Sequence, residues 1–239
     1  MNWYNNESDG KLFAGVKKGI AMMNTLNKYF PADILEKYEI YSYYHAAEIL
    51  SAAYPNEFHE LIDALRNVDI SIDDILEAGG NESAIPPKFK KVLFPKGWAE
   101  TRVHGDLHIE LTIRSGEEEN RSFVLQDYVN GYNIDFFKNK IALDTEWNSK
   151  DQTFDRDLMA MRTYYEFNII SMGIIITRGT ELKTFPKHYG LNKYGASTTW
   201  MGKLTYRLDS RRSGGCPILA IGITPRCIRG YQPDNLTSD

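Results

Sequence analysis

Two carboxylates stand two residues apart in a segment whose composition predicts a β-strand. Asp144 and Glu146 lie within residues 140–147, which are otherwise mainly apolar. Because alternate residues of a strand share a face, both side chains are expected on one face, roughly 6–7 Å apart along the backbone. Asp135 belongs to the strand predicted at 134–137, and a short hairpin folds it back beside them. The sequence therefore predicts three carboxylates at one end of a sheet.

Three converging carboxylates suit Mg²⁺, a hard cation that prefers oxygen ligands and keeps several of its water molecules. A metal ion held there can polarise a scissile phosphate and activate a water that attacks it in line. The polar run at 148–151 that follows the strand favours this interpretation over a merely solvated face of an amphipathic strand. Paired carboxylates could also serve a glycosidase, although the exposed aromatic residues of a sugar platform cannot be placed around them.

A second set of possible metal ligands lies in the strand predicted at 103–113. Four polar side chains alternate there with apolar residues and so share a face: His104, Asp106, His108 and Glu110. Imidazole and carboxylate groups together could bind a transition metal, but ligands spaced by two along one strand rarely all reach one ion. We therefore expect a solvated or DNA-facing strand here, and leave open whether His108 or Glu110 joins the carboxylate site.

The first third of the chain has helical periodicity. Apolar residues recur at three- and four-residue spacing from Lys11 to about Leu65, and Pro31 and Pro55 mark the breaks. A polar stretch at 78–83, followed by Pro86–Pro87, predicts a loop.

After this loop the period changes to two. Residues 103–113 predict a half-buried strand, and residues 122–127 predict its antiparallel return. The strands at 134–137 and 140–147 are expected to join tightly through Lys138–Asn139. These four strands predict an antiparallel meander.

A helix and two buried strands are expected next. Residues 151–167 predict a helix, and the segments 169–177 and 219–223 are almost continuously apolar, as in strands covered on both faces. A right-handed crossover through the helix would place the 169–177 strand parallel to the 140–147 strand. The order predicts an α/β fold with a mixed central β-sheet flanked by helices.

Length and composition fit a single domain. The chain has 239 residues, of which 42% are hydrophobic and 25% charged, as in a globular protein with a sizeable core. We expect a mostly helical part at 1–85 and an α/β core at 100–225. No apolar run is long enough to span a membrane, and no secretory signal is recognisable. Cys216 and Cys227 are too few for a disulfide scaffold or a zinc site, so the protein is expected to be cytoplasmic.

The net charge of −4 is unevenly distributed. Residues 1–86 carry 6 Lys and Arg against 14 Asp and Glu, whereas residues 187–239 carry 8 against 3. A phosphate-binding surface needs only local positive charge, so the basic last quarter is compatible with DNA binding. Arg211 and Arg212 are its candidate phosphate contacts; the alternative is a solvated turn before Gly214–Gly215.

Taken in order, these motifs resemble the BglII family of type II restriction endonucleases, a branch of the PD-(D/E)xK nucleases that is also similar to BamHI. Asp135, Asp144 and Glu146 match its Asp-x8-acid-x-(Gln/Glu) pattern. The resemblance covers about residues 40–225 and includes Tyr44–Leu50, Ile174–Gly179, Phe185–Pro186 and Ala196–Thr199. It implies a restriction-endonuclease-like fold, with Mg²⁺ bound by Asp135 and Asp144. Glu146 stands where the superfamily often has Lys and the BglII type has Gln, which leaves its proton-transfer role open.

The resemblance also implies DNA contacts and partners. The family touches bases with positions that correspond here to Asn148, Ser149, Lys150, Ser197, Thr198 and Thr199. It implies Mg²⁺-dependent cleavage of double-stranded DNA at a short palindrome by a homodimer, whose two-fold symmetry matches that of the DNA. A cognate DNA methyltransferase is expected in the same system. The alternatives are a non-cleaving DNA-binding module of the same fold and a repair or junction-resolving nuclease.

Overall fold

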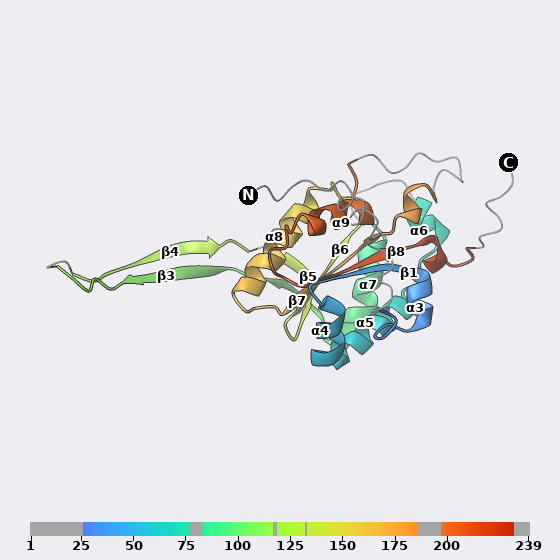
Figure 1. Cartoon of the computed structure of the whole chain (residues 1–239). Helices are drawn as coiled ribbons and strands as arrows, with labels where there is room; N and C mark the ends of the chain where they lie inside the picture. The colour runs from blue at the N-terminus through green and yellow to red at the C-terminus, as the bar shows by residue number, and fades with distance from the viewer. Residues whose placement is uncertain (1–25, 77–82, 117–118, 132, 186–196, 232–239) are drawn as a thin grey trace, which may run out of the picture.

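A mixed six-stranded sheet forms the centre of the molecule (Figure 1). The structure, a computed structural model, describes residues 26–76, 83–116, 119–131, 133–185 and 197–231. In spatial order the strands are β1 (Tyr38–Tyr43), β8 (Ile218–Ile223), β7 (Met172–Arg178), β6 (Ile141–Glu146), β5 (Asn133–Lys138) and β2 (Ala99–Arg102). β6, β7 and β8 run parallel, and the other neighbours are antiparallel. The predicted mixed sheet is confirmed. The predicted parallel pairing of β6 with β7, the two strands that the helix at Thr153–Glu166 connects, is confirmed as well.

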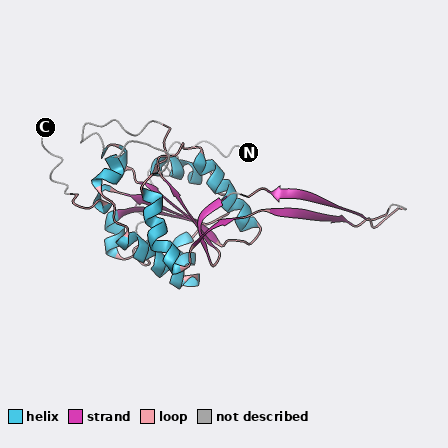
Figure 2. Cartoon of the chain, turned by 180° about the vertical axis from the view of Figure 1, so that it is seen from behind, coloured by secondary structure: helices cyan, strands magenta, loops and turns pink. Residues whose placement is uncertain are grey.

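Helices cover both faces of this sheet (Figure 2). One layer contains α3 (Ala32–Lys37), α4 (Ala46–Ala53), α5 (Pro55–Asn67), α6 (Ile72–Leu76) and α7 (Ile85–Leu93). The other contains α8 (Thr153–Glu166) and α9 (Met201–Asp209), and short 3₁₀ turns lie at η1 (Phe94–Lys96), η2 (Glu181–Lys183) and η4 (Pro225–Cys227). Leu143 and Ile174 pack in the core under α3–α7, whereas Ala142 and Ile175 pack under α8 and α9. Burial on both faces is the reason why these strands are continuously apolar.

The hairpin that carries Asp135 and Asp144 closes through a two-residue turn at Asn139–Lys140. Both turn residues have positive φ, 44° and 67°, as a type I′ hairpin turn requires. The turn therefore lies one residue later than the predicted Lys138–Asn139. Lys138 instead ends β5, and its Nζ donates a hydrogen bond to Glu60 Oε1 at 2.6 Å, which ties the hairpin to α5.

The helical periodicity predicted between Lys11 and Leu65 is interrupted by β1. This strand pairs antiparallel with β8, and its residues Tyr38 and Ile40 are buried. The helical prediction is wrong here because pairing with a strand near the C-terminal end of the chain overrides the local preference. The part of that prediction at 11–25 lies outside the described residues.

Pro86–Pro87, predicted to belong to a loop, lie in the first turn of α7. Proline is tolerated there because the first N–H groups of a helix have no partner within the helix. Of the polar stretch predicted as a loop at 78–83, only Ser83 lies within the described residues. None of the helices in the described ranges is both long and apolar enough to cross a membrane.

β3 (Gly105–Leu111) and β4 (Arg121–Val129) form a separate two-stranded sheet that projects from the body of the molecule (Figure 1). Their antiparallel pairing is confirmed, but their predicted place as half-buried strands in one meander with β5 and β6 is wrong. β2, which the periodicity does not reveal, takes that place next to β5. The alternating pattern of β3 predicts which residues share an apolar face, but not whether other residues cover that face. In the structure Leu111 and Phe123 are 50% and 49% exposed. We call residues 103–130 the arm.

Candidate active site

The antiparallel pairing of β5 with β6 brings Asp135 next to Asp144. Phe136 pairs with Leu143, so the next residues outward face each other directly. Asp144 Oδ1 accepts a hydrogen bond from the Asp135 N–H at 2.8 Å. Asp135 Oδ2 accepts from the N–H and the Oγ1 of Thr145 at 3.0 and 2.8 Å. Backbone pairing and these hydrogen bonds together fix the positions of both carboxylates.

Both carboxylates line a cavity of about 450 Å³. Its lining combines acidic, basic and amide groups from the end of β2, from β5 and the loop before it, from β6 and from α8: Arg102, Gly131, Asn133, Asp135, Asp144, Glu146 and Arg156. Glu146 joins Asp144 there because residues spaced by two along a strand share a face. Strand geometry thus delivers all three predicted carboxylates to one site.

The site holds more negative than positive charge. Burial, followed by the neighbouring charge of Asp135, raises the pKa of Asp144 from its ordinary 3.8 to about 7. The hydrogen bond from the Asp135 N–H and the charge of Arg156 act in the opposite direction but do not outweigh burial. A cation beside Asp144 would favour its ionised form. The electrostatics of the cavity therefore suit a positively charged ligand.

Three side chains orient Glu146. Ser149 Oγ and Thr153 Oγ1 donate hydrogen bonds to its Oε2, the second at 2.9 Å. Arg156 Nη2 donates to its Oε1 at 3.3 Å. All three donors follow within ten residues of Glu146, in the loop after β6 and the first turns of α8. The end of one strand and the start of the next helix therefore hold one carboxylate in place.

Asp157 is a fourth carboxylate beside this site, and the motif analysis missed it. It lies on α8, is only 4% exposed, and its Oδ1 accepts a hydrogen bond from Arg156 Nε at 2.9 Å. Burial, and after it the charges of Asp144 and Glu146, raise its pKa well above the ordinary value. One signal could have revealed it: Asp157 interrupts the apolar face of the predicted helix, where an unpaired acid would be costly. Arg102 and Asn133 carry no comparable signal.

The alternative metal-ligand set lies on the arm. Asp106 Oδ1 accepts a hydrogen bond from the Asp127 N–H at 2.9 Å. His108 and Glu110 pair with Val124 and Ser122 of β4, and neither lines the cavity. Among the residues that the structure describes, no three His, Cys, Asp or Glu side chains are arranged to hold a metal ion by themselves.

Two carboxylates suffice for Mg²⁺. This ion keeps several water molecules and is usually bound through one or two carboxylates together with substrate phosphates. Asp135 and Asp144 offer oxygen ligands of this kind in a cavity with excess negative charge. The donor set fits Mg²⁺ better than a transition metal, for which imidazole or thiolate ligands would be expected.

The two segments predicted to touch DNA bases lie side by side. The Thr199 N–H donates to the Ser149 carbonyl at 3.0 Å, the Asp151 N–H donates to the Ser197 carbonyl at 2.7 Å, and the residues between them form an isolated antiparallel bridge. Ser197 is exposed, whereas the side chain of Thr199 is fully buried. Since Ser149 also holds Glu146, this pair of segments begins directly at the carboxylate site.

The position of Asn148 and Lys150 in the first of these segments is equally defined. Asn148 has a φ of 61°, a left-handed conformation that Asn tolerates better than most residues. Lys150 forms the bridge with Thr198 and is exposed. The chain therefore turns as it leaves β6, and Lys150 presents an exposed cation four residues after Glu146.

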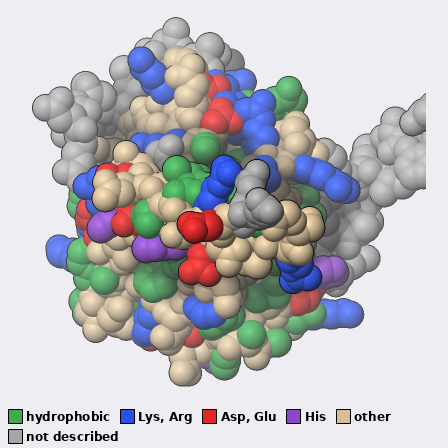
Figure 3. Space-filling view, turned by 90° about the vertical axis from the view of Figure 1, so that its left-hand side faces the viewer, with side chains coloured by type: hydrophobic (Ala, Val, Ile, Leu, Met, Phe, Trp, Pro, Cys, Tyr) green, Lys and Arg blue, Asp and Glu red, His purple; other side chains and the backbone are tan. Residues whose placement is uncertain are grey.

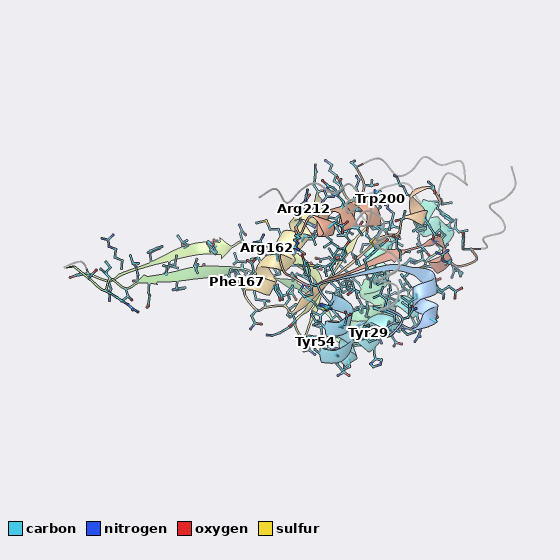
Figure 4. The ribbon with its side chains drawn as sticks, in the orientation of Figure 1. Tyr29, Tyr54, Arg162, Phe167, Trp200 and Arg212 are labelled. Atoms are coloured by element: carbon cyan, nitrogen blue, oxygen red, sulfur yellow. The ribbon has the colours of Figure 1, made fainter. Side chains whose placement is uncertain are left out.

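Arg211 and Arg212 follow the end of α9, where Arg212 is labelled in Figure 4. Arg211 is exposed, with a φ of 57°. Arg212 Nη1 forms an ion pair with Asp155, which also accepts a hydrogen bond from Arg207 Nη2 at 2.9 Å. Acids at the start of α8 therefore neutralise part of the basic charge of the last quarter of the chain. Sequence charge counts alone could not show this pairing.

Comparison with known families gives a match to most of the chain. The family described as restriction endonuclease BglII/BglIII matches residues 38–223. The matched region begins at the first residue of β1 and ends at the last residue of β8, so it contains the whole central sheet and all the cavity residues. Of the motifs that carry the resemblance, Pro186 and Ala196 lie outside the described residues. A comparison with curated proteins finds no significant match.

Proposed function

Because the chain belongs to the BglII/BglIII family of restriction endonucleases, we propose that it is a type II enzyme that uses Mg²⁺ to hydrolyse both strands of DNA at a short palindrome. The observation that carries this proposal is the juxtaposition of Asp135 and Asp144, joined by a 2.8 Å hydrogen bond, with Glu146 in the same cavity. Acidic oxygens with a basic wall suit a phosphodiester and the cation that accompanies it.

In this proposal Asp135 and Asp144 hold the metal ion. Mg²⁺ held there would supply a Lewis acid for the scissile phosphate and a bound water of lowered pKa. Glu146, oriented by Ser149 and Thr153, accepts the proton of the attacking water. The hydrogen bonds from Ser149 and Thr153 hold Glu146 in a fixed orientation in the same cavity, which suits a general base that must reach the nucleophile.

Arg156 and Arg102 supply the positive charge of the cavity. Arg156 is about half exposed, at 53% of its side chain, so its guanidinium can contact a phosphate while it remains linked to Glu146. Charge-assisted contacts of this kind stabilise the extra negative charge of the transition state. We assign both arginines to phosphate binding.

The remaining partners follow from the same activity. A homodimer on a palindrome supplies one active site for each strand by symmetry. A cognate DNA methyltransferase would protect the host DNA, and the enzyme would act in the cytoplasm, where invading DNA arrives.

Digestion of phage DNA tests the proposed function. The protein is incubated with unmodified phage DNA and Mg²⁺, with and without EDTA. Discrete, EDTA-sensitive fragments are expected. A smear would indicate a non-specific nuclease, cutting confined to branched DNA a junction-resolving enzyme, and binding without cutting a DNA-binding module; each of these outcomes contradicts the proposal.

Base reading is assigned to the paired segments at 148–150 and 197–199, through the side chains that reach solvent. Replacing the exposed Ser197 by Ala is expected to reduce the preference for cognate over non-cognate DNA by about 10-fold, since one base contact contributes about 1–3 kcal/mol of discrimination. Competition binding with cognate and scrambled duplexes measures it. Ser210→Ala, which removes a hydroxyl that donates to the Tyr206 carbonyl, is the control. An unchanged preference in the Ser197 variant would show that this segment is only structural.

If Arg211 and Arg212 bind phosphates, the DNA affinity should depend on salt concentration in a predictable way. Each phosphate contact contributes about −0.9 to the slope of log K against log salt, so replacing both by Gln should flatten that slope by roughly one to two units. Cognate and non-cognate binding should weaken alike, because phosphate contacts carry no sequence information. Isotherms across a salt series, with Ca²⁺ in place of Mg²⁺, measure it. Arg66→Gln on α5, which breaks an ion pair with Asp33, is the control, and equal slopes for the double variant and wild type would remove both arginines from the DNA surface.

A further inference from the structure

Asp157 is a buried acid that the proposed mechanism does not use. It lies on the face of α8 that packs on the sheet, where Phe154 and Leu158 are fully buried, and it is itself only 4% exposed. It does not line the catalytic cavity. Its Oδ2 is buried and accepts no hydrogen bond from any donor in the described part of the chain. Burying a carboxylate with one oxygen unpaired costs stability, so Asp157 does not serve the packing of the core.

The side chain that Asp157 holds is that of Arg156. Asp157 Oδ1 accepts a hydrogen bond from Arg156 Nε at 2.9 Å and forms an ion pair with Nη2 at 2.8 Å. Arg156 Nη2 also donates to Glu146 Oε1 at 3.3 Å. Two carboxylates thus hold one edge of the guanidinium, the edge formed by Nε and Nη2. Because the guanidinium is planar and rigid, holding this edge fixes the orientation of the whole group.

A second arginine of the same helix shows what is unusual about this arrangement. Arg162, labelled in Figure 4, pairs with Glu166 at 2.8 Å, and the two side chains are 52% and 55% exposed. Exposed pairs of this kind contribute little, because both long side chains must be ordered to form them. Arg156 is as exposed as Arg162, at 53%, but its partner Asp157 is enclosed in the close-packed core. The buried carboxylate is therefore a fixed anchor for an exposed cation.

Surface charge by itself does not distinguish Arg156 from other cations. On the side of the molecule shown in Figure 3, Lys and Arg side chains lie among Asp and Glu side chains, so positive charge at the surface is common. Arg156 differs because its side chain lines the cavity that holds Asp144 and Glu146 while its guanidinium rests on a buried acid. Its position inside the cavity therefore depends on Asp157.

We propose that Asp157 is a positioning residue for DNA cleavage, which holds the guanidinium of Arg156 in place for the scissile phosphate. This inference rests on the proposed function for the phosphate that Arg156 contacts. Asp157 Oδ1 can accept the N–H groups of Arg156 whether the carboxyl group is ionised or neutral, so the anchor does not depend on its charge. A cation held in advance favours the transition state, because it need not be ordered during the reaction.

Two substitutions of Asp157 separate positioning from structural support. Leu has the same branched skeleton but accepts no hydrogen bond, whereas Asn keeps Oδ1. In single-turnover experiments, Asp157→Leu should slow cleavage by about 10–100-fold, whereas Asp157→Asn should stay within about threefold of the wild type, as should DNA binding by both variants in Ca²⁺. The melting temperature of Asp157→Leu should fall by no more than about 3 °C, because water can solvate the half-exposed guanidinium left behind.

A double-mutant cycle tests whether Asp157 acts through Arg156. In the Arg156→Gln background, Asp157→Leu should slow cleavage no further, whereas additive effects of the two substitutions would overturn the proposal. Glu166→Leu, which removes the partner of Arg162 on the same helix, is the matched control and should keep wild-type cleavage.

The Arg156 Nε–H signal in a ¹⁵N NMR spectrum gives a readout that needs neither DNA nor metal. It is assigned by its loss in Arg156→Gln. We expect it to be protected from solvent exchange in the wild type and in Asp157→Asn, and to be lost through exchange in Asp157→Leu. An unchanged signal in Asp157→Leu, equally slow cleavage by both Asp157 variants, or cleavage that falls only in step with the melting temperature would each overturn the proposal. A wild type that cuts no DNA but shows these NMR changes would contradict the proposed function alone.

Discussion

Replacing Asp144 by Asn is expected to reduce DNA cleavage by about 10³-fold or more, while specific DNA binding is retained. The amide oxygen of the substituted side chain can still accept the hydrogen bond that the Asp135 N–H makes at 2.8 Å, so the local structure is preserved. What is lost is the charge that binds the metal ion, and with it the stabilisation of the transition state. Removing a negative charge near phosphates can even favour binding. Single-turnover cleavage in Mg²⁺ and binding isotherms in Ca²⁺ measure the two effects separately.

A matched control separates this effect from a general loss of charge. Asp63→Asn on α5 removes a carboxylate that pairs with Lys96 at 2.9 Å, in the helical layer on the other side of the sheet, and should leave cleavage unchanged. Asp135→Asn should behave like the Asp144 variant. Wild-type turnover in either site variant would remove these carboxylates from the active site.

The same Asp144→Asn substitution is expected to stabilise the protein by about 1–3 kcal/mol at pH 8 without divalent metal, and by almost nothing near pH 4. The folded-state pKa of Asp144 is raised, chiefly by burial, from 3.8 to about 7. Between these values the unfolded chain has released the proton that the folded chain still holds. Wild-type stability therefore falls as pH rises from about 4 to about 7 and then levels off, whereas Asn cannot ionise and avoids this loss.

Urea denaturation at several pH values between 4 and 8, in EDTA, measures the difference. Asp63→Asn is again the control and should show no gain that grows with pH. The pKa of Asp157 is also raised, by burial and by the charge of Asp144. The stability of the Asp144→Asn variant should therefore still depend on pH, but less than the stability of the wild type. Added Mg²⁺ should stabilise the wild type and not Asp144→Asn, because only a ligand that binds the folded state shifts its stability. A stability difference independent of pH would contradict the burial of an ionisable Asp144.

The sequence alone was sufficient for the elements whose partners lie close in the chain. The order of the strand at Ile141–Glu146, helix α8 and the strand at Met172–Arg178 leaves essentially one arrangement, since such crossovers are right-handed. The continuous apolar runs of these strands predict burial on both faces. The shared face of Asp144 and Glu146 follows from the period of two of any strand. The first and third inferences depend on backbone geometry, and the second depends on the polarity of the strand's own residues, so none of them requires knowledge of a distant partner.

Tertiary structure decided which surfaces meet. β1 is a strand because it pairs with β8, at the other end of the matched region, and β3 with β4 forms the arm because β2 occupies the position beside β5. Asp157 comes close to Glu146 only once α8 packs on the sheet, and the segment at 197–199 meets Ser149 only through the fold. Periodicity tells which side of a segment is apolar, but the free energy that selects its partner comes from contacts between residues far apart in the chain. For that reason the carboxylate motif could be read from the sequence, whereas its neighbours could not.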